Sequence, residues 1–201
     1  MKALKISYSF NKSKNIKRIY LTIHNKNKLP HTKRGKIITT KLLHISKEIT
    51  QKANSIAIDL IEKLDMIGLL AVEFFLCKNG DLLVNEIAPR PHNSGHHTIE
   101  CCNTSQYAQH LRSILNLPLG DTTLINPGAM INILGEKGFI GPAIYEGLEK
   151  ILGFSGVYPH IYGKSDTKPF RKMGHVTITG STLLEVKRIA DQVKETIKVK
   201  A

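Results

Sequence analysis

Apolar and polar residues alternate along the first part of the chain in the way that half-buried strands require. Residues 5–10 (KISYSF) and 17–23 (KRIYLTI) show this alternation, and the polar stretch 11–15 predicts a hairpin turn between them. Residues 24–45 have no such period, and their Pro, Gly and Lys residues predict an irregular, basic connection. The chain is therefore expected to open with two antiparallel strands and a long link.

The period then changes to that of a helix. Residues 46–64 place apolar side chains three and four positions apart, and Ser46 suits the N-cap. Two apolar runs follow, 69–77 and 81–87, on either side of Asn79-Gly80. Because Asn-Gly is a strong signal for a tight hairpin, these runs are expected to be neighbouring antiparallel strands.

A polar loop then leads to a predicted helix at about 104–116, which Pro118 and Gly120 end. A second unit is expected to begin near Asn126, with a strand, a short helix, two strands and a capped amphipathic helix. These five elements correspond in order to MINILGE, GLEKILGF, HIYGK, HVTITG and STLLEVKRIADQVKETIKV. The apolar face predicted for the last helix consists of Leu183, Leu184, Val186, Ile189, Ala190 and Val193. The pattern predicts an α+β fold with antiparallel sheets.

Composition fits this picture of a globular protein. A chain of 201 residues with 41% hydrophobic residues can bury the core of one domain or two small ones. No apolar run approaches the roughly 20 residues that span a bilayer, and the first residues have no apolar signal-peptide core. The three cysteines, Cys77, Cys101 and Cys102, have no metal-binding spacing and are expected to be reduced, structural thiols. We therefore expect a cytoplasmic protein without a membrane segment.

The formal net charge of +13 suggests an anionic partner, either nucleic acid or a phosphorylated small molecule. The basic excess lies mainly in the first 37 and last 15 residues, and the basic stretches have no interleaved aromatic residues of the kind that stack on RNA bases. A solvated, lysine-rich surface is thus favoured over nucleic-acid binding, which stays the less favoured alternative.

Two glutamates stand in apolar strands. Glu73 lies six residues before Asn79-Gly80 and Glu86 six residues after it, so the predicted hairpin makes them cross-strand neighbours. Two adjacent carboxylates repel each other unless a cation lies between them, and Mg²⁺ with phosphate oxygens and water suits two such ligands. The strand period alone fits equally well with two surface glutamates on the solvent face of the hairpin.

The loop after these strands favours the metal site. Residues 85–96 (NEIAPRPHNSGH) place several hydrogen-bond donors directly behind one of the two carboxylates. Arg90 offers a planar fork for phosphate or carboxylate, and Gly95 permits close approach of the backbone. A loop so rich in donors beside two acids predicts an anion site next to the metal.

The stretch VEFFLCKNGDLLVNEIAPRPHNSGHHTIE, with TSQYAQHLRSILNLPLG and MINILGE after it, resembles the N5-carboxyaminoimidazole ribonucleotide synthase family of ATP-grasp enzymes. HIYGK and RKMGHVTITG resemble that family's C-terminal domain, so the resemblance runs from about residue 46 to the end. It implies the C-terminal part of an ATP-grasp fold in residues 1–122 and a small β-rich C-terminal domain in residues 123–201. It also implies a ligase that carboxylates aminoimidazole ribonucleotide with ATP and bicarbonate in purine biosynthesis.

By this resemblance Glu73 and Glu86 would hold Mg²⁺ between ATP phosphates. The catalytic residues would be Arg90, His92 and Asn93, and substrate-binding residues would be Asn85, Glu86, Ser94 and His96. The ribonucleotide phosphate would be bound by Lys164, Arg171 and Lys172. Three cations around one short turn also suit a phosphomonoester on chemical grounds, although a solvated basic turn is the simpler alternative.

The chain departs from the family pattern in its first part. Intact members begin with a Rossmann-like domain, a glycine-rich lid and an adenine-binding hinge, whereas Gly35 is the only glycine of this chain's first 67 residues. Lys5 stands where the family has an acidic residue, and Leu21 stands near a position that is often polar. The departures predict a C-terminal fragment that binds nucleotide poorly by itself. Such a fragment could be a non-catalytic remnant, the product of a misplaced start, or one piece of a split enzyme. The expected partners are a separate N-terminal ATP-grasp fragment and a second copy in the family's homodimer.

Overall fold

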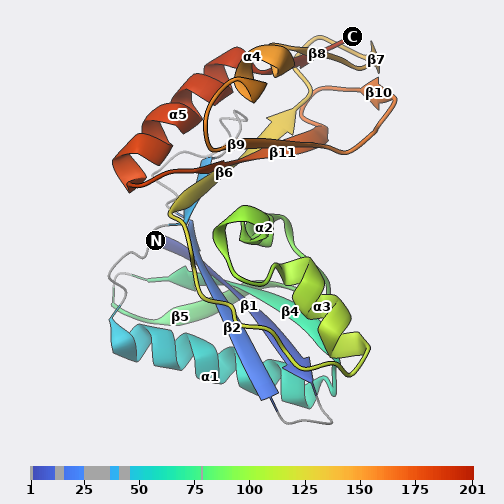
Figure 1. Ribbon diagram of the computed structural model, residues 1–201. Helices are drawn as coiled ribbons and strands as arrows, with labels where there is room; N and C mark the ends of the chain where they lie inside the picture. Colours follow the sequence, from blue (N-terminus) through green and yellow to red (C-terminus); the bar gives the residue numbers. More distant parts are fainter. Residues whose placement is uncertain (1, 12–15, 25–36, 41–45, 78) are drawn as a thin grey trace. The chain divides into compact units, whose positions relative to one another are not determined.

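The computed structural model describes residues 2–11, 16–24, 37–40, 46–77 and 79–201, and its description of the residues before 46 is confined to the backbone (Figure 1). The chain forms two compact units. The first contains the two opening strands and residues 46–125, and the second contains residues 37–39 and 126–201. Each unit has its own hydrophobic core, so each is described by itself.

The first unit is built on a four-stranded antiparallel sheet in the order β2-β1-β4-β5. The strand bounds are β1 Lys2–Asn11, β2 Ile16–His24, β4 Gly68–Leu76 and β5 Leu82–Ala88. Helix α1 (Lys47–Lys63) covers one face, and α2 (Thr98–Cys101) and α3 (Gln106–Ile114) lie on the other (Figure 1). The short helix η2 (Asn93–Gly95) precedes α2.

Alternation along β4 decides which side chains meet which layer. Leu70, Val72 and Phe74 are buried against α1, where they contact Ala53, Ala57 and Ile61. The residues between them, including Leu69 and Glu73, project to the opposite face because successive side chains of a strand alternate. Glu73 thus points to the face that carries η2, α2 and α3.

The predicted helices of this unit are confirmed with slightly different ends. Ser46 caps α1, and its Oγ accepts a hydrogen bond from the N–H of Ile49 at 3.2 Å. Helix α3 is shorter than the predicted range 104–116 because Ser105 caps it in the same way, accepting from the N–H of Ala108 at 3.2 Å.

The two predicted hairpins are confirmed as antiparallel pairs, β1 with β2 and β4 with β5. The turn predicted at 11–15 falls mostly outside the described residues. In β1 the backbone of Lys5 is paired with both Thr22 and Glu73, and Leu21 is paired with Ile6, but their side chains are outside the described part of the chain.

The turn between β4 and β5 is longer than predicted, because the strands end at Leu76 and Leu82 and not beside Asn79-Gly80. The N–H of Cys77 donates to the carbonyl of Asp81 at 2.9 Å, and Gly80 adopts a φ of 87°, which a side chain would disfavour. The pairing then changes register: Phe74 is opposite Val84, whereas Glu73 is opposite Glu86. Asn85 is the extra residue of this β-bulge.

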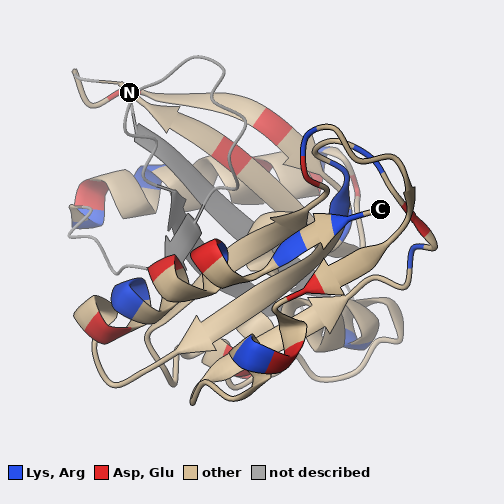
Figure 2. Ribbon diagram, turned by 90° about the horizontal axis from the view of Figure 1, so that it is seen from above, with Lys and Arg blue, Asp and Glu red and all other residues tan. Residues whose placement is uncertain are grey.

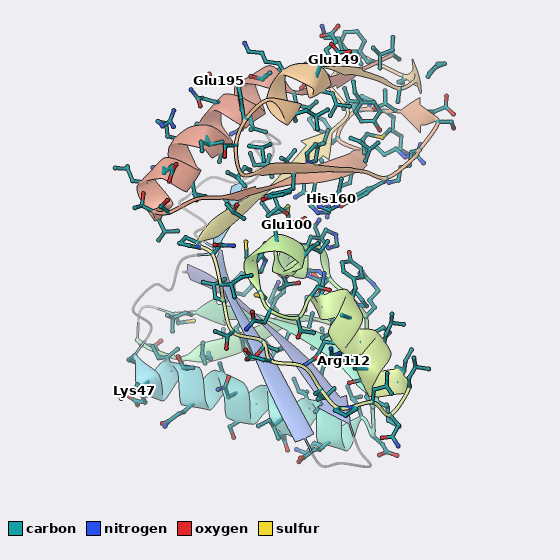
Figure 3. All side chains as sticks on the ribbon, viewed as in Figure 1. Lys47, Glu100, Arg112, Glu149, His160 and Glu195 are labelled. Carbon is teal, nitrogen blue, oxygen red and sulfur yellow. The ribbon has the colours of Figure 1, made fainter. Side chains whose placement is uncertain are left out.

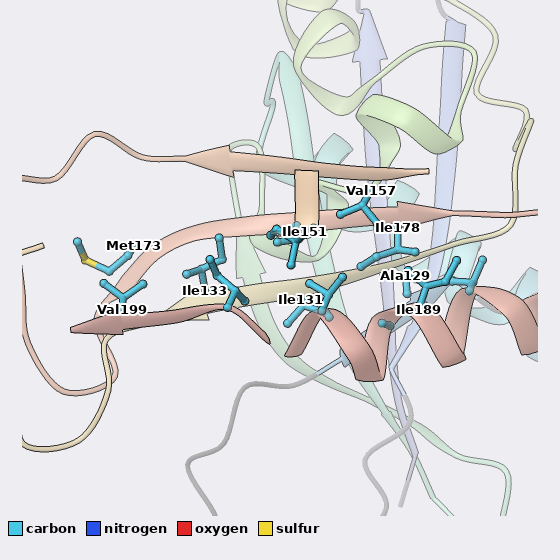
Figure 4. Packing of buried hydrophobic residues seen from close by; sticks show 14 residues of the cluster. Ala129, Ile131, Ile133, Ile151, Val157, Met173, Ile178, Ile189 and Val199 are labelled. Atoms are coloured by element: carbon cyan, nitrogen blue, oxygen red, sulfur yellow. The ribbon is translucent and has the colours of Figure 1, made fainter. Parts of the chain in front are cut away.

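The second unit is built on a four-stranded sheet in the order β3-β6-β11-β9. Its strands are β3 Ile37–Thr40, β6 Gly128–Leu134, β9 Val157–Ile161 and β11 Lys172–Thr179. Helices α4 (Leu148–Leu152) and α5 (Leu183–Thr196) pack on one face of it (Figure 1). Figure 4 shows the core between these layers, which includes Ala129, Ile131, Ile151, Ile178 and Ile189.

Residues on the other face of this sheet form an aromatic row. His160 projects from β9 on the side away from α5 (Figure 3), and its ring stacks on that of His175 with 4.4 Å between centroids. The hydroxyl of Tyr162 lies 3.0 Å from Nδ1 of His175. The predicted strand HIYGK is thus the end of β9 and the turn after it.

Several short strands were not predicted. They are β3, inside the supposedly irregular stretch 24–45, and β7 Gly141–Pro142, β8 Ile144–Glu146, β10 Asp166–Thr167 and β12 Lys198–Lys200. Segments of two to four residues are too short to show a period, so their partners alone identify them. The predicted apolar face of α5 was wrong at Leu184, which is 81% exposed, whereas Val186, Ile189, Ala190 and Val193 are buried.

Candidate active site

Glu73 and Glu86 are cross-strand partners on the face of the sheet opposite α1. The bulge at Asn85 is what places them there. If Asn85 were paired regularly with Glu73, the register of Phe74 with Val84 would continue, and Glu86 would be opposite Val72 on the α1 face. Glu73 is 7% exposed, whereas the side chain of Glu86 on the edge strand is 54% exposed.

The two carboxylates and His92 offer three ligand atoms within 4.8 Å of one another. Nδ2 of Asn85 approaches Oε2 of Glu73 at 3.4 Å from the bulge. Two carboxylates close together, one of them nearly buried, are stabilised by a shared cation, and hard oxygen ligands suit Mg²⁺. The donor set therefore fits a magnesium ion.

His92 faces both carboxylates. Its Nε2 lies 3.7 Å from Oε1 of Glu73 and 4.0 Å from Oε1 of Glu86, which is beyond hydrogen-bond distance. Its Nδ1 accepts a long hydrogen bond from the N–H of Ser94 at 3.4 Å and lies 2.7 Å from Ser94 Oγ. The backbone N–H directed at Nδ1 favours the tautomer in which Nε2 carries the proton. The nitrogen facing the carboxylates is thus a donor and not a metal ligand.

Gln106, at the start of α3, holds the backbone of this loop. Its Oε1 accepts from the N–H of His92 at 2.9 Å, and its Nε2 donates to the carbonyl of His92 at 2.9 Å. Gly95 lies against this carboxamide so closely that a Cβ at Gly95 would collide with Gln106 Oε1. Gly95 was predicted to let a ligand approach the backbone closely. In the structure, the space left by its missing side chain is occupied by the carboxamide of Gln106.

His96 and His97 have different environments. Nδ1 of His96 accepts from Nε2 of Gln106 at 3.0 Å, and the hydroxyl of Tyr107 lies 2.8 Å from the same nitrogen. His97 is buried at 2% exposure, and its Nδ1 lies 2.9 Å from the carbonyl of Ser94. Burial lowers the pKa of His97 from 6.5 to about 4, and the bond to Ser94 offsets part of that effect.

The remaining residues predicted in this loop differ in their exposure to solvent. Arg90 is exposed, and its Nη1 donates to the neighbouring carbonyl of Pro91 at 3.0 Å. Asn93 is partly buried at the first position of η2, and Ser94 is buried at its second. The structure thus gathers Asn85, Glu86, His92 and Ser94 around Glu73, whereas the Arg90 guanidinium is turned along its own loop.

Lys164, Arg171 and Lys172 surround one turn of the second unit. Nζ of Lys164 donates to the carbonyl of Lys172 at 2.6 Å and lies 5.7 Å from the ring centroid of Tyr162. Nη1 of Arg171 donates to the carbonyl of Asp166 at 2.9 Å. These bonds tie two of the three cationic side chains to the same loop, which concentrates positive charge there.

Sequence reasoning missed Gln106, Thr98 and His97, which hold the loop from beneath. Thr98 Oγ1 donates to the carbonyl of Gly95 at 2.6 Å and accepts from the N–H of Gln106 at 2.9 Å. A buried glutamine in an amphipathic helix has no sequence signal of its own. The apolar residues Tyr107, Leu111 and Ile114 recur at helical spacing on another face of α3, so the period assigns Gln106 to the polar side.

Two known protein domains match this chain, and each falls mainly in one of its two units. Residues 18–107 match the ATP-grasp domain, and residues 128–189 match the phosphoribosylaminoimidazole carboxylase C-terminal domain. The Bacillus subtilis N5-carboxyaminoimidazole ribonucleotide synthase is 48% identical over 133 residues, which cover 66% of this chain and 33% of that protein. The chain belongs to the N5-carboxyaminoimidazole ribonucleotide synthase family.

Solved structures of this family show the same fold. The Thermotoga maritima N5-carboxyaminoimidazole ribonucleotide synthetase superimposes with a TM-score of 0.87 at 39% identity, over 100% of this chain and 52% of that one. The Aspergillus clavatus synthase in complex with ADP and 5-aminoimidazole ribonucleotide gives a TM-score of 0.79 at 29% identity, over 96% of this chain and 52% of that one. The chain therefore has the C-terminal ATP-grasp and C-terminal domain folds of the synthase family, and it spans about half the length of these solved relatives.

Proposed function

We propose that the chain supplies the metal-binding and substrate-binding part of an ATP-dependent carboxylation of 5-aminoimidazole ribonucleotide by bicarbonate. The observation that carries this proposal is the pairing of Glu73 with Glu86 through the bulge at Asn85, with His92 facing both carboxylates. The Aspergillus clavatus relatives were crystallised with ATP, and with ADP and 5-aminoimidazole ribonucleotide, which supports the same ligands for this site.

In the proposed reaction, bicarbonate attacks the γ-phosphate of ATP to give carboxyphosphate and ADP. Carboxyphosphate then breaks down to CO₂ and inorganic phosphate, and the ribonucleotide amine attacks the CO₂ and loses a proton to give the N5-carboxylated product. Mg²⁺, held by Glu73 and Glu86, would neutralise phosphate charge. The N–H at Nε2 of His92 would donate to an oxygen of the bicarbonate or of the transferred phosphoryl group. Arg90 and Asn93, on the same loop, would orient the bicarbonate by donating hydrogen bonds to its oxygens.

We place the phosphate of the ribonucleotide at the turn that carries Lys164, Arg171 and Lys172. Three cationic side chains suit a phosphomonoester, whose three terminal oxygens accept charge-assisted hydrogen bonds. Both charge signs are interspersed along α5 of the same unit (Figure 2), so the net charge of the chain does not produce a uniformly basic helix there. This distribution favours a local phosphate site over a nucleic-acid surface.

The metal assignment is tested with Mn²⁺ as a spectroscopic substitute for Mg²⁺, titrated into the purified chain and followed by electron paramagnetic resonance. Glu73→Gln and Glu86→Gln should each weaken Mn²⁺ binding by about tenfold or more, since even outer-sphere changes have effects of that size. Glu149→Gln, an exposed glutamate of α4, is the control and should leave binding unchanged. Equal Mn²⁺ affinity in all four proteins would show that the carboxylate pair is not a metal site.

Ribonucleotide binding is tested by calorimetry with 5-aminoimidazole ribonucleotide. Lys164→Met and Arg171→Met should weaken binding, and Lys150→Met on α4 should not. Binding of ribonucleotide with bicarbonate-dependent ADP formation would establish the enzyme. A folded chain that binds neither metal nor ribonucleotide would identify the non-catalytic remnant, whereas salt-sensitive RNA binding without ribonucleotide binding would support the nucleic-acid alternative.

The remaining assignments stay predictions. We propose that residues 1–122 form the ATP-grasp part and residues 123–201 the C-terminal domain. A separate N-terminal ATP-grasp fragment, a homodimer and a cytoplasmic location are further predictions. No helix in the described part of the chain has the length and apolar character needed to cross a membrane.

A further inference from the structure

The side chain of Gln106 makes three hydrogen bonds to two histidines of the candidate site. Gln106 is 0% exposed, so its polar side-chain atoms need hydrogen-bond partners inside the protein. Oε1 accepts from the N–H of His92 at 2.9 Å. Of the two hydrogens on Nε2, one is donated to the carbonyl of His92 at 2.9 Å and the other to Nδ1 of His96 at 3.0 Å.

This geometry determines the orientation of the carboxamide. The N–H of His92 can only donate, so the atom 2.9 Å from it must be the oxygen, and the amide nitrogen must face His96. A carboxamide nitrogen can only donate, so Nδ1 of His96 is an acceptor. The neutral His96 ring therefore carries its proton on Nε2.

His92 has the same tautomer for a related reason. The backbone N–H of Ser94 is directed at Nδ1 of His92, and Gln106 holds the His92 backbone from both sides. One buried side chain thus fixes the main chain of one histidine and the protonated nitrogen of the other.

We propose that Gln106 is a positioning residue that keeps His96 as an Nε2–H donor and fixes the backbone that orients His92. This inference rests on the proposed function, because the donors would serve the bicarbonate and carboxyphosphate oxygens of that reaction. A glutamate at this position would lack the N–H that Nδ1 of His96 requires, and its carboxylate would instead accept a proton from that nitrogen. The side chain must therefore be an amide.

The protein contains a matched control one turn further along α3. Gln109 is also 0% exposed, and it holds the backbone of Gly120 in the same bidentate way. Its Oε1 accepts from the Gly120 N–H at 2.9 Å, and its Nε2 donates to the Gly120 carbonyl at 3.0 Å. Replacement of either glutamine by glutamate would remove the N–H that donates to a buried backbone carbonyl. Of the two, however, only Gln106 also contacts a histidine side chain.

The test is imidazole ¹⁵N chemical shifts of the full chain without metal, nucleotide or substrate, in wild type, Gln106→Glu and Gln109→Glu. Wild type and Gln109→Glu should show Nε2–H tautomers at His92 and His96. Gln106→Glu should shift the His96 spectrum toward protonated Nδ1. An Nδ1–H tautomer at His96 in wild type would overturn the proposal. Because this result comes from the wild-type spectrum, it tests the proposal even if neither variant folds. An unchanged His96 spectrum in folded Gln106→Glu would also overturn it.

Adding bicarbonate to the same samples tests separately whether the histidine donors serve the proposed substrate. A bicarbonate-dependent shift at His96 in wild type that is lost in Gln106→Glu and kept in Gln109→Glu supports the positioning role in full. The expected tautomers without any bicarbonate shift would uphold the hydrogen-bond assignment and contradict the proposed substrate. Failure of the inference and failure of the proposed function therefore give different spectra.

Discussion

At the scale of single residues, the candidate site depends on groups that lie under it. His97 is buried directly after the loop that carries His92, and its Nδ1 lies beside the carbonyl oxygen of Ser94. A charge on its ring would therefore be poorly solvated. The neutral ring donates its Nδ1 proton to Ser94 and so supports the turn of η2 from below. Protonation of His97 would disrupt the base of the site.

His97 should make folding pH-dependent. Its pKa is about 4 in the folded protein and 6.5 without burial, so its effect on stability is absent above pH 6.5. As pH falls from 6.5 toward 4, the unfolded state binds a proton that the folded state does not, and stability decreases by up to about 3 kcal/mol. Urea unfolding at pH 7 and pH 5 measures this change. His97→Asn, which keeps a donor for Ser94, should have a flatter pH dependence, and an equal slope in both proteins would contradict the assignment.

The three cysteines should differ sharply in reactivity. Burial raises the pKa of Cys101 to about 12 and that of Cys102 to about 11, so both thiols stay protonated near neutral pH. Cys77, beside the β4–β5 turn, is partly exposed. Iodoacetamide at pH 8 should therefore add one label to the native chain, at Cys77, and three after denaturation. Rapid native labelling of Cys101 or Cys102 would show that their region opens readily.

At the scale of elements, the bulge in β5 places Glu86 on the same face of the hairpin as Glu73 and so forms the candidate metal site. A regular hairpin with the register of Phe74 and Val84 would turn Glu86 toward the apolar layer against α1. The extra residue at Asn85 reverses that orientation for the residues after it, because side chains alternate with a period of two.

Insertion of one alanine between Asn85 and Glu86 should therefore abolish Mn²⁺ binding, whereas Asn85→Ala should retain it. The substitution keeps the residue count and loses a contact of 3.4 Å to Glu73, so a decrease of a few-fold at most is expected. The insertion moves Glu86 one position along the strand, opposite Val72 on the α1 face, and lowers stability as well. Circular dichroism establishes whether the insertion variant is folded, and Mn²⁺ binding by a folded variant would show that the register after the bulge does not control the site.

At the scale of the whole molecule, the two largest hydrophobic clusters of the described residues have no residue in common. One lies between α1 and the β4 face of the first sheet, and the other lies between α4, α5 and the second sheet. The candidate metal residues belong to the first unit and the candidate phosphate residues to the second, so each function has its own structural support.

Ile151→Ala tests whether the two cores are energetically separate. Ile151 is 0% exposed in the second core, and the cavity left by its side chain should cost about 2–5 kcal/mol. Amide hydrogen exchange should accelerate in β6, β11 and α5 while α1 and β4 keep their protection. A matching loss of protection in α1 would mean that the two units unfold as one.

Much of this arrangement was predictable because local patterns encode it. The cap at Ser46, the helical period after it and the hairpin of Asn79-Gly80 depend on residues a few positions apart. The facing of Glu73 and Glu86 was also predicted, but by counting from a two-residue turn. The molecule reaches the same pairing through a longer turn and a bulge, whose effects on register cancel.

The sequence by itself determined the long helices, the antiparallel strand pairs, the acid pair and the resemblance to a family of synthases, since periodicity and motif residues are local information. Only the tertiary structure decided the short strands, the lowered pKa of His97 and the role of Gln106. Each of these depends on a partner distant in sequence or on exclusion from water. Gln106 contacts His92 across 14 positions, and no period in the chain connects the two.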